Sequence, residues 1–414
     1  MLLLGRNSNK YDLFIFVLIL SLSFGILGNA LQAPRIIGFL LIPQLGKVWP
    51  YLRKHYKTHL TATLFFLIYA TFSLVWTPDI VSGIKELCYY IIHFIIFFEI
   101  IGFSCYAKDK NNTISLSWLI LVSITLIIAY WEIITGNHLS VAFQDSDLMG
   151  TADYGIRRFA SVTFGNYNAY VTFICFAYPF LLYRFNGTNK TKVVTYGIPV
   201  VLLLSFASVL INASRGGLLS LVIMYAIYFI HSKKSFKNLF PLLLLVVLTV
   251  YAVSNYGELL FSVIEGRISD TGFTNDTVRT EIWSVALQCF INSAGMGVGI
   301  GGNELSLFAI SRMPMMPHNM FIEVLMEFGA IVFMIFIISL IKTFKKGRKS
   351  LDKGVKIVSN CFFLSLPIVA VIDSSYCLSP LIFIVFASVY SFTLVPCANI
   401  NRNVKHYGKT TNML

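Results

Sequence analysis

The chain has 414 residues, of which 57% are hydrophobic and only 12% are charged, and its formal net charge at pH 7 is +13. So large an apolar fraction excludes an ordinary soluble globular domain and is typical of a polytopic membrane protein. The positive charge does not indicate nucleic-acid binding, because most basic residues lie in short loops between apolar segments, where they set membrane orientation and attract anionic lipid.

Apolar stretches long enough to cross a bilayer recur along the chain. A membrane-spanning helix needs about 20 mostly apolar residues. The twelve stretches that fit are residues 12–31, 33–49, 60–76, 82–106, 115–133, 167–183, 193–212, 216–231, 238–255, 319–341, 357–372 and 379–397. The second is short and flanked by Pro34 and Pro43, so a re-entrant segment is the alternative there. We therefore expect an all-α integral membrane protein in which residues 1–414 form a single polytopic domain.

The basic residues support this count of spans. With twelve spans and both termini in the cytoplasm, most of the 32 Lys and Arg residues fall in inner loops. The eight basic residues that remain outside are Arg35, Lys85, Arg157, Arg158, Arg215, Arg267, Arg279 and Arg312. Seven of the eight are arginine, whose planar fork binds phosphate through two hydrogen bonds. Some of these arginines are therefore candidates for phosphate binding. The alternative is that they snorkel to the headgroups or pair with acidic residues of the loops.

Cysteines and membrane-embedded ionisable residues carry weaker signals. The seven cysteines have no paired spacing, which predicts packing residues and neither a disulfide framework nor a metal cluster. Glu86 and Glu132 lie close enough to helix ends for solvation. His93 and Glu99 share one apolar segment, where a structural hydrogen-bonded pair is the simpler interpretation and a functional role the alternative.

The outer loop of residues 134–166 offers two candidate features. Asp145 and Asp147 have the spacing of a metal-binding carboxylate pair, but sugar-nucleotide donors are cytoplasmic and this pair is outside, so a solvated loop is the better interpretation. Arg157 and Arg158 precede the sequence Phe-Gly-Asn-Tyr-Asn at 164–168, and together they are the better candidate for the entrance to a site.

Arg215 stands in a tight turn between two predicted spans. The turn reads Asn-Ala-Ser-Arg-Gly-Gly at 212–217, which places the guanidinium at membrane depth. An unpaired charge there is costly, so Arg215 should face a cavity or an anionic ligand, and the two glycines would allow close approach of the backbone to it. The alternative is that Arg215 snorkels to the outer headgroups.

Residues 256–318 form one large extracytoplasmic loop within the domain, too long for a plain connector. Apolar residues at helical spacing over 279–291 predict an amphipathic helix on the membrane surface. The glycine-rich segment 295–302 is a weak candidate for a phosphate-binding loop, because it lacks the usual Gly-Lys-Ser/Thr ending. A flexible lid hinge is the equal alternative.

His318 follows this loop, at the start of the span 319–341. A helix N-terminus disfavours an imidazolium, so His318 should be mostly neutral near pH 7 and able to accept a proton. The alternative is a histidine that caps the helix at the interface. The lone Asp373 in the last outer loop carries no assigned chemistry.

These features together resemble the bacterial O-antigen ligase and O-antigen polymerase superfamily. The resemblance is carried by Ser-Arg-Gly-Gly-Leu-Leu at 214–219, Arg-Thr-Glu-Ile-Trp at 279–283, Gly-x-Gly at 297–299, and His318-Asn319 followed after nine residues by Gly329. It covers roughly residues 155–345 in motif and the whole chain in topology. Val332 departs from the ligase pattern, and the Phe-Gly-Asn-x-Asn sequence is more similar to repeat-unit polymerases.

The resemblance implies a glycosyltransferase of the bacterial inner membrane whose donor is an undecaprenyl-pyrophosphate-linked oligosaccharide. It assigns Arg215 and Arg279 to the donor pyrophosphate and His318 to removal of the acceptor proton. Arg157, Arg158, Arg312 and Asn319 are further candidates for pyrophosphate or glycan binding. Neither a metal nor a cofactor is expected, because a lipid pyrophosphate is already a good leaving group once its charge is compensated.

Three functions remain open at this point. Polymerisation of lipid-linked repeat units is preferred, and a chain-length regulator would be a possible further partner. The alternative is an O-antigen ligase, for which lipid A core is the acceptor. A polysaccharide flippase or transporter is the remote alternative, because such proteins usually carry internal repeats that this chain lacks.

Overall fold

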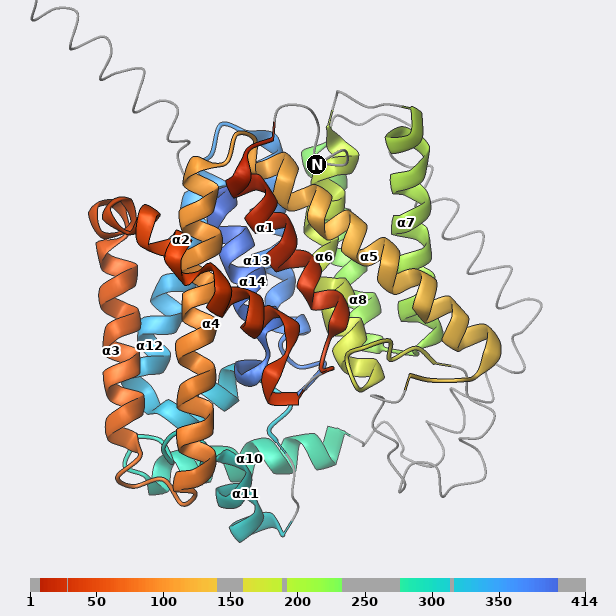
Figure 1. Ribbon diagram of the computed structural model, residues 1–414. Coiled ribbons are helices and arrows are strands. Elements are labelled where there is room, and N and C mark those ends of the chain that lie inside the picture. Colours follow the sequence, from red (N-terminus) through yellow and green to blue (C-terminus); the bar gives the residue numbers. More distant parts are fainter. Residues whose placement is uncertain are drawn as a thin grey trace, which may run out of the picture.

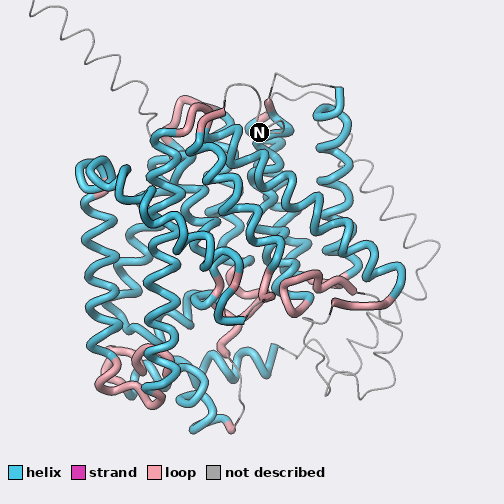
Figure 2. The backbone as a smooth tube through the Cα atoms, viewed as in Figure 1, coloured by secondary structure: helices cyan, strands magenta, loops and turns pink. Residues whose placement is uncertain are grey.

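The computed structural model describes residues 8–27, 29–139, 159–187, 192–232, 276–312 and 316–393. All regular secondary structure in these ranges is helical, as Figure 2 shows. The predicted span 238–255, the Asp145–Asp147 pair, Arg157 and Arg158 lie outside the described residues.

Thirteen α-helices make up the described part of the chain (Figure 1). They are α1 (Lys10–Leu20), α2 (Ala33–His55), α3 (Lys57–Ser73), α4 (Ile80–Tyr106), α5 (Lys110–Thr135), α6 (Tyr167–Asn186), α7 (Lys192–Ile211), α8 (Arg215–His231), α10 (Asp276–Asn292), α11 (Asn303–Ser311), α12 (Met320–Arg348), α13 (Lys353–Val369) and α14 (Pro380–Phe392). Short 3₁₀ helices occur at η1 (Ser21–Phe24), η2 (Asn29–Leu31) and η5 (Tyr376–Leu378).

The all-helical class is confirmed for the described residues. The predicted membrane spans agree only in part with the helices that the structure shows. Among these residues, α4, α5 and α12 are long and apolar enough to cross a membrane, and Gly197–Ile211, Arg215–His231 and Pro380–Phe392 are shorter apolar helices. The expected first span, 12–31, divides into α1, η1 and η2. The expected second span is part of α2, which runs to His55 and contains Pro43 and Pro50. The count of twelve spans stays a prediction.

The helices begin where short polar side chains cap them. Asp79, Asp109 and Asn166 accept hydrogen bonds from backbone amides in the first turns of α4, α5 and α6. Asp352 and Ser379 do the same for α13 and α14. A cap of this kind satisfies amides that have no partner within the helix, which explains why each helix starts at its residue.

The core lies among α4, α5, α6, α13 and α14. Trp118 on α5 stacks on Phe180 of α6 with ring centroids 5.3 Å apart, and its indole N–H donates to Ser388 Oγ on α14 at 3.2 Å. Figure 1 shows α10 and α11 together at one end of this bundle, while α3 stands at its edge.

The glycine-rich segment 295–302 locks into a break in α12. Gly329 has φ 73° and ψ −176°, which interrupts the helix, and Ala330 N donates to Gly295 O at 2.9 Å. A Cβ on Gly329 would lie 2.4 Å from Gly295 O, and one on Gly297 would lie 2.5 Å from Glu327 O. Only glycine permits this close approach of two backbones. The segment is therefore a packed structural joint.

Candidate functional site

The loop between α13 and α14 forms the floor of the candidate site. Glu323 on the first turn of α12 is buried and its carboxylate accepts hydrogen bonds from Ser375 N at 2.8 Å and Tyr376 N at 2.9 Å. The hydroxyl of Tyr376 donates to Val369 O at 2.5 Å, and Met320 N donates to Ala370 O at 2.9 Å. These contacts attach the start of α12 firmly to the loop that carries Asp373.

His318 is held on both sides just before α12. Asn319 caps the helix, its side-chain oxygen accepting from Phe321 N at 3.0 Å and Ile322 N at 3.3 Å. The indole N–H of Trp283 on α10 donates to Pro317 O at 2.7 Å. His318 has φ 49°, a left-handed conformation that is unfavourable for a residue with a side chain. The surrounding contacts maintain this conformation and set the direction of the imidazole.

The imidazole of His318 is neutral, and one of its ring nitrogens has no hydrogen-bond partner in the described part of the chain. Burial, followed by the positive charge of Arg279, lowers the pKa of His318 to about 4. Its Nδ1 is buried and makes no hydrogen bond within the described part of the chain. A neutral imidazole with an unpartnered nitrogen is equipped to accept a proton. The sequence predicted the neutral form from the helix terminus, whereas burial is the larger cause.

Arg279 contacts the loop and acts on the imidazole through its charge. Its Nη1 donates to Val371 O at 3.0 Å. Burial raises the pKa of Asp373 to about 6, while hydrogen bonds from Ser374 N and the Asn166 side chain and the charge of Arg279 act in the opposite direction. Arg279 thus acts electrostatically on both His318 and Asp373, and it brings a base, a cation and an acid into one cluster.

Arg215 begins α8 beside the same loop. The hydroxyl of Ser214 accepts from Gly217 N at 3.2 Å and caps the helix. A Cβ on Gly216 would lie 3.2 Å from Ile372 Cγ1, so the first turn of α8 lies directly beside the residue that precedes Asp373. Gly217 packs still more closely, because a Cβ there would lie 2.5 Å from Val171 Cγ1 on α6. The glycines that were expected to admit a ligand bring helices together, while Arg215 itself is exposed.

The remaining predicted site residues and the outer arginine Arg35 are not among the residues of the cluster. Arg312 is exposed at the C-terminus of α11, with φ 59°. The side-chain oxygen of Asn319 is used in the helix cap. Arg35 is buried, where it donates to His93 Nε2 at 3.1 Å, Ala30 O at 3.0 Å and Leu378 O at 3.1 Å, so this outer arginine has a structural role.

Sequence reasoning missed Asp373 and the role of Asn166. Asp373 is the only acidic residue that follows Asp352, and a single acid within apolar sequence was the available signal. Asn166 belongs to the Phe-Gly-Asn-Tyr-Asn sequence that was expected at a site entrance, and its hydrogen bond to Asp373 places the start of α6 at this cluster.

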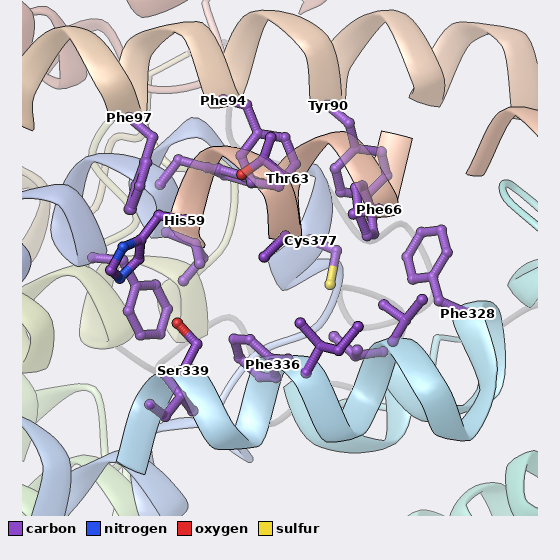
Figure 3. A pocket seen from close by; sticks show the side chains of 18 of the residues that line it. His59, Thr63, Phe66, Tyr90, Phe94, Phe97, Phe328, Phe336, Ser339 and Cys377 are labelled. Carbon is purple, nitrogen blue, oxygen red and sulfur yellow. The ribbon is translucent and has the colours of Figure 1, made fainter. Parts of the chain in front are cut away.

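An apolar cavity of about 200 Å³ lies next to the cluster, between α3, α4, α12 and α14. Met320, two residues after His318, lines the cavity, and Ser339, Leu340 and His59 line it towards the other end of α12. Aromatic rings form most of the wall between these ends, as Figure 3 shows. Since Met320 and Leu340 are 20 residues apart on α12, the cavity extends along about 30 Å of helix.

The glycine-rich segment does not provide a phosphate-binding loop. The N–H groups of residues 297–302 all donate to acceptors in the chain: Ser293 Oγ, Met326 O, Glu327 O, Ser73 Oγ, Glu327 Oε1 and Gly299 O. A phosphate-binding loop needs backbone amides that point at the ligand. Both interpretations from sequence, phosphate loop and lid hinge, are therefore replaced by a structural joint.

Comparison with known proteins agrees with the resemblance. Residues 200–337 match the model of a protein family described as O-Antigen ligase. The matched range begins in α7 and ends in α12, so it contains Arg215, Arg279 and His318. No curated protein matches the chain. The apolar helices and the family match indicate a multi-pass membrane protein.

Proposed function

We propose that the chain transfers a glycan from undecaprenyl pyrophosphate to a sugar hydroxyl, because residues 200–337 match the family model described as O-Antigen ligase. The cluster of His318, Arg279 and Asp373 beside an elongated apolar cavity is the observation that carries the proposal. The cavity offers apolar walls to part of the isoprenoid chain, while the arginines accept the pyrophosphate at its polar end.

In the proposed reaction His318 Nδ1 removes the proton of the acceptor hydroxyl. The hydroxyl oxygen forms a bond to the anomeric carbon of the donor as the bond from that carbon to the pyrophosphate oxygen breaks. The electron pair leaves on undecaprenyl pyrophosphate, whose charge Arg279 and Arg215 compensate. The proton ends on the imidazole. A single displacement of this kind inverts the configuration at the anomeric carbon, and a trapped covalent glycosyl-enzyme would contradict it.

Donor binding would also prepare the base. Burial and, to a smaller extent, the charge of Arg279 lower the pKa of His318 in the free protein. A pyrophosphate bound to Arg279 would offset that charge, and the pKa of the imidazole would then rise towards the range where a general base is effective. His318 would gain basicity only in the presence of the donor.

Polymerisation of repeat units is the preferred reaction. Its support is the Phe-Gly-Asn-x-Asn sequence, whose Asn166 bonds to Asp373. Val332, the departure from the ligase pattern, lines the apolar cavity. Transfer to lipid A core is the alternative. A deletion strain separates the two on a polysaccharide gel: chains of a single repeat indicate a lost polymerase, whereas bare core with polymer left on the carrier indicates a lost ligase.

The direct test uses purified protein with a lipid-linked oligosaccharide. We expect His318→Ala to reduce transfer by about 10²- to 10⁴-fold, the usual contribution of a general base, while donor binding stays within a few fold of wild type. Arg215→Lys should also impair transfer, because lysine cannot form two parallel hydrogen bonds to phosphate. His55→Ala is the control, since His55 is exposed at the end of α2. Unchanged turnover in His318→Ala would remove this residue from the role of base.

A further inference from the structure

A second groove lies on the other side of α3, between α2, α3 and α4, with a volume of about 680 Å³. Its walls are apolar, and Trp49, Leu64 and Ile91 are 43%, 58% and 43% exposed. Thr63 and Phe94 line both this groove and the cavity described above, so they form the partition between the two spaces.

The groove has two cations at one end. Arg53 from the last turn of α2 and Lys57 from the first turn of α3 line it beside Trp49. No Asp or Glu occurs between Asp12 and Asp79, so neither α2 nor α3 supplies a carboxylate to these cations. Within the described part of the chain, neither cation forms an ion pair with a carboxylate.

The polar end of this groove is opposite to His318. α3 begins at Lys57 and ends at Ser73, whose hydroxyl accepts from Ile300 N at 3.0 Å in the glycine-rich segment. That segment is joined to α12 at Gly329, on the half of the helix that starts next to His318. A lipid with its headgroup at Arg53 and Lys57 therefore cannot be the donor bound at the candidate site.

The length of the groove fits one leaflet. Its lining on α3 extends from Lys57 to Leu67, about 15 Å of helix. This equals half of the roughly 30 Å hydrocarbon core of a bilayer. The cavity on the other side of α3 follows α12 for about twice that distance. An ordinary acyl chain matches the shorter space, and a polyprenyl chain would extend beyond it.

We propose that this groove, defined by Trp49, Arg53, Lys57, Leu64 and Ile91, binds an anionic phospholipid of the leaflet predicted to be cytoplasmic. The phosphate lies between Arg53 and Lys57, and an acyl chain lies against Leu64, Leu67, Ile91 and Phe98. Charge complementarity selects an anionic headgroup over a zwitterionic one, whose own cation would lie near the two basic side chains. The bound lipid would support α3, whose buried side chains are only Ala70 and Ser73, near its other end.

The test measures quenching of Trp49 fluorescence by brominated lipids in purified full-length protein. Phosphatidylglycerol and phosphatidylcholine with the same brominated acyl chains are compared, and Trp49→Phe identifies the part of the signal that comes from this indole. Two cations near the headgroup are expected to favour phosphatidylglycerol by about tenfold in relative affinity. Arg53→Gln with Lys57→Gln should reduce that ratio to near one, without loss of quenching by phosphatidylcholine.

Lys345→Gln with Lys346→Gln is the matched control, because it also removes two positive charges but at residues that do not line the groove. This variant should keep the preference. Equal loss in both double variants would show that overall charge attracts the lipid and would overturn the site. The site would also be overturned if the wild-type protein did not prefer phosphatidylglycerol to phosphatidylcholine. A preference that inorganic phosphate abolishes would overturn it as well, because it would identify a site for a small anion. Circular dichroism and gel filtration establish that each variant is folded.

Discussion

At His318 two influences act in the same direction on one imidazole. Burial removes the solvent that stabilises the charged form, and Arg279 adds a positive neighbour, so the pKa lies at about 4 instead of the usual 6.5. The unfavourable backbone at φ 49° is maintained by Trp283 on one side and the Asn319 cap on the other. The residue is thus held in place and kept uncharged, which its proposed role as the base requires.

Asp373 should dominate the acid side of the pH profile. Burial raises the pKa of Asp373 to about 6, so its carboxylate becomes protonated as the pH falls through 6. Arg279 then loses the negative charge with which it interacts. His318 stays neutral until about pH 4. We expect kcat/KM of the wild type to fall below about pH 6. Asp373→Asn, which imitates the protonated form, should be less active at pH 7 and should show no fall until about pH 4.

The control for this measurement is Asp352→Asn, since Asp352 caps α13 and is separate from the cluster. Its profile should keep the wild-type midpoint. An Asp373→Asn protein that still loses activity near pH 6 would show that another group titrates there, and the assignment of the acid-side fall to Asp373 would be wrong.

At the scale of elements, the joint between the glycine-rich segment and α12 determines how the second half of the site is supported. Val298 N donates to Met326 O at 2.8 Å and Gly299 N to Glu327 O at 3.1 Å. Glu327 is buried, and its carboxylate accepts from Gly301 N at 3.0 Å and Asn303 Nδ2 at 2.8 Å. These bonds connect the segment after α10 to α11 and α12, so a change in the joint should affect α10, which carries Arg279 and Trp283.

Gly329→Ala should therefore destabilise the protein. The new Cβ would lie 2.4 Å from Gly295 O and 2.5 Å from Met296 O, at a φ of 73° that alanine adopts only with strain. We expect the free energy of unfolding to fall by about 1–3 kcal/mol, which would appear as a lower midpoint of thermal unfolding in detergent. Gly46→Ala in α2 is the control, because nothing lies within 4 Å of its Cβ position and alanine is the better helix former. Equal midpoints for the two variants would contradict the joint.

The elements follow from local sequence more closely than their connections do. Apolar stretches and polar caps locate α4, α5, α6 and α12 within a few residues. The role of the glycines was not predictable, because it depends on two segments about thirty residues apart that approach backbone to backbone. Glu132 was expected to be solvated, yet it is fully buried and its carboxylate accepts from Ser161 N and Val162 N, both at 2.8 Å.

The same limit applies to the candidate site. Arg279 and His318 were selected from motifs, and the structure places the charge of Arg279 close enough to lower the pKa of His318. Asp373 was not selected, because a single carboxylate has no spacing pattern and its partners Arg279 and Asn166 come from distant parts of the chain. His93 bonds to Arg35 on another helix, and not to Glu99 as the sequence suggested. Tertiary contacts of this kind have no signature in a single sequence.

On the scale of the whole molecule, the starts of α3 and α5, which carry Lys57 and Lys110, lie at the opposite end from the candidate site. The ring of His59 at the start of α3 contacts Tyr390 near the end of α14, with centroids 5.4 Å apart. Lys110 at the start of α5 donates to Ser391 O at 2.5 Å. The first turns of α3 and α5 therefore lie at the same end of the molecule as the last turn of α14. Trp283, Pro317 and Asp373 lie at the opposite end.

This polarity predicts the sidedness of the membrane protein. Short loops rich in Lys and Arg stay in the cytoplasm, and the junction of α12 and α13 carries seven such residues between Lys342 and Lys356. Leu351 in that junction is 99% exposed, and Glu304 on α11 is exposed near the opposite end. In intact cells, a membrane-impermeant maleimide should label Glu304→Cys directly, and Leu351→Cys only after permeabilisation.

Wild-type protein is the background control, because most of its described cysteines, among them Cys105, Cys175 and Cys361, are buried and should react only after denaturation. The reverse labelling pattern would place His318 on the cytoplasmic side, where carrier-linked glycans are assembled and not polymerised. Equal labelling of both positions in intact cells would mean that α12 does not cross the membrane. Since α12 connects His318 at one end to the lysine-rich junction at the other, either result would remove the basis for an extracytoplasmic transferase.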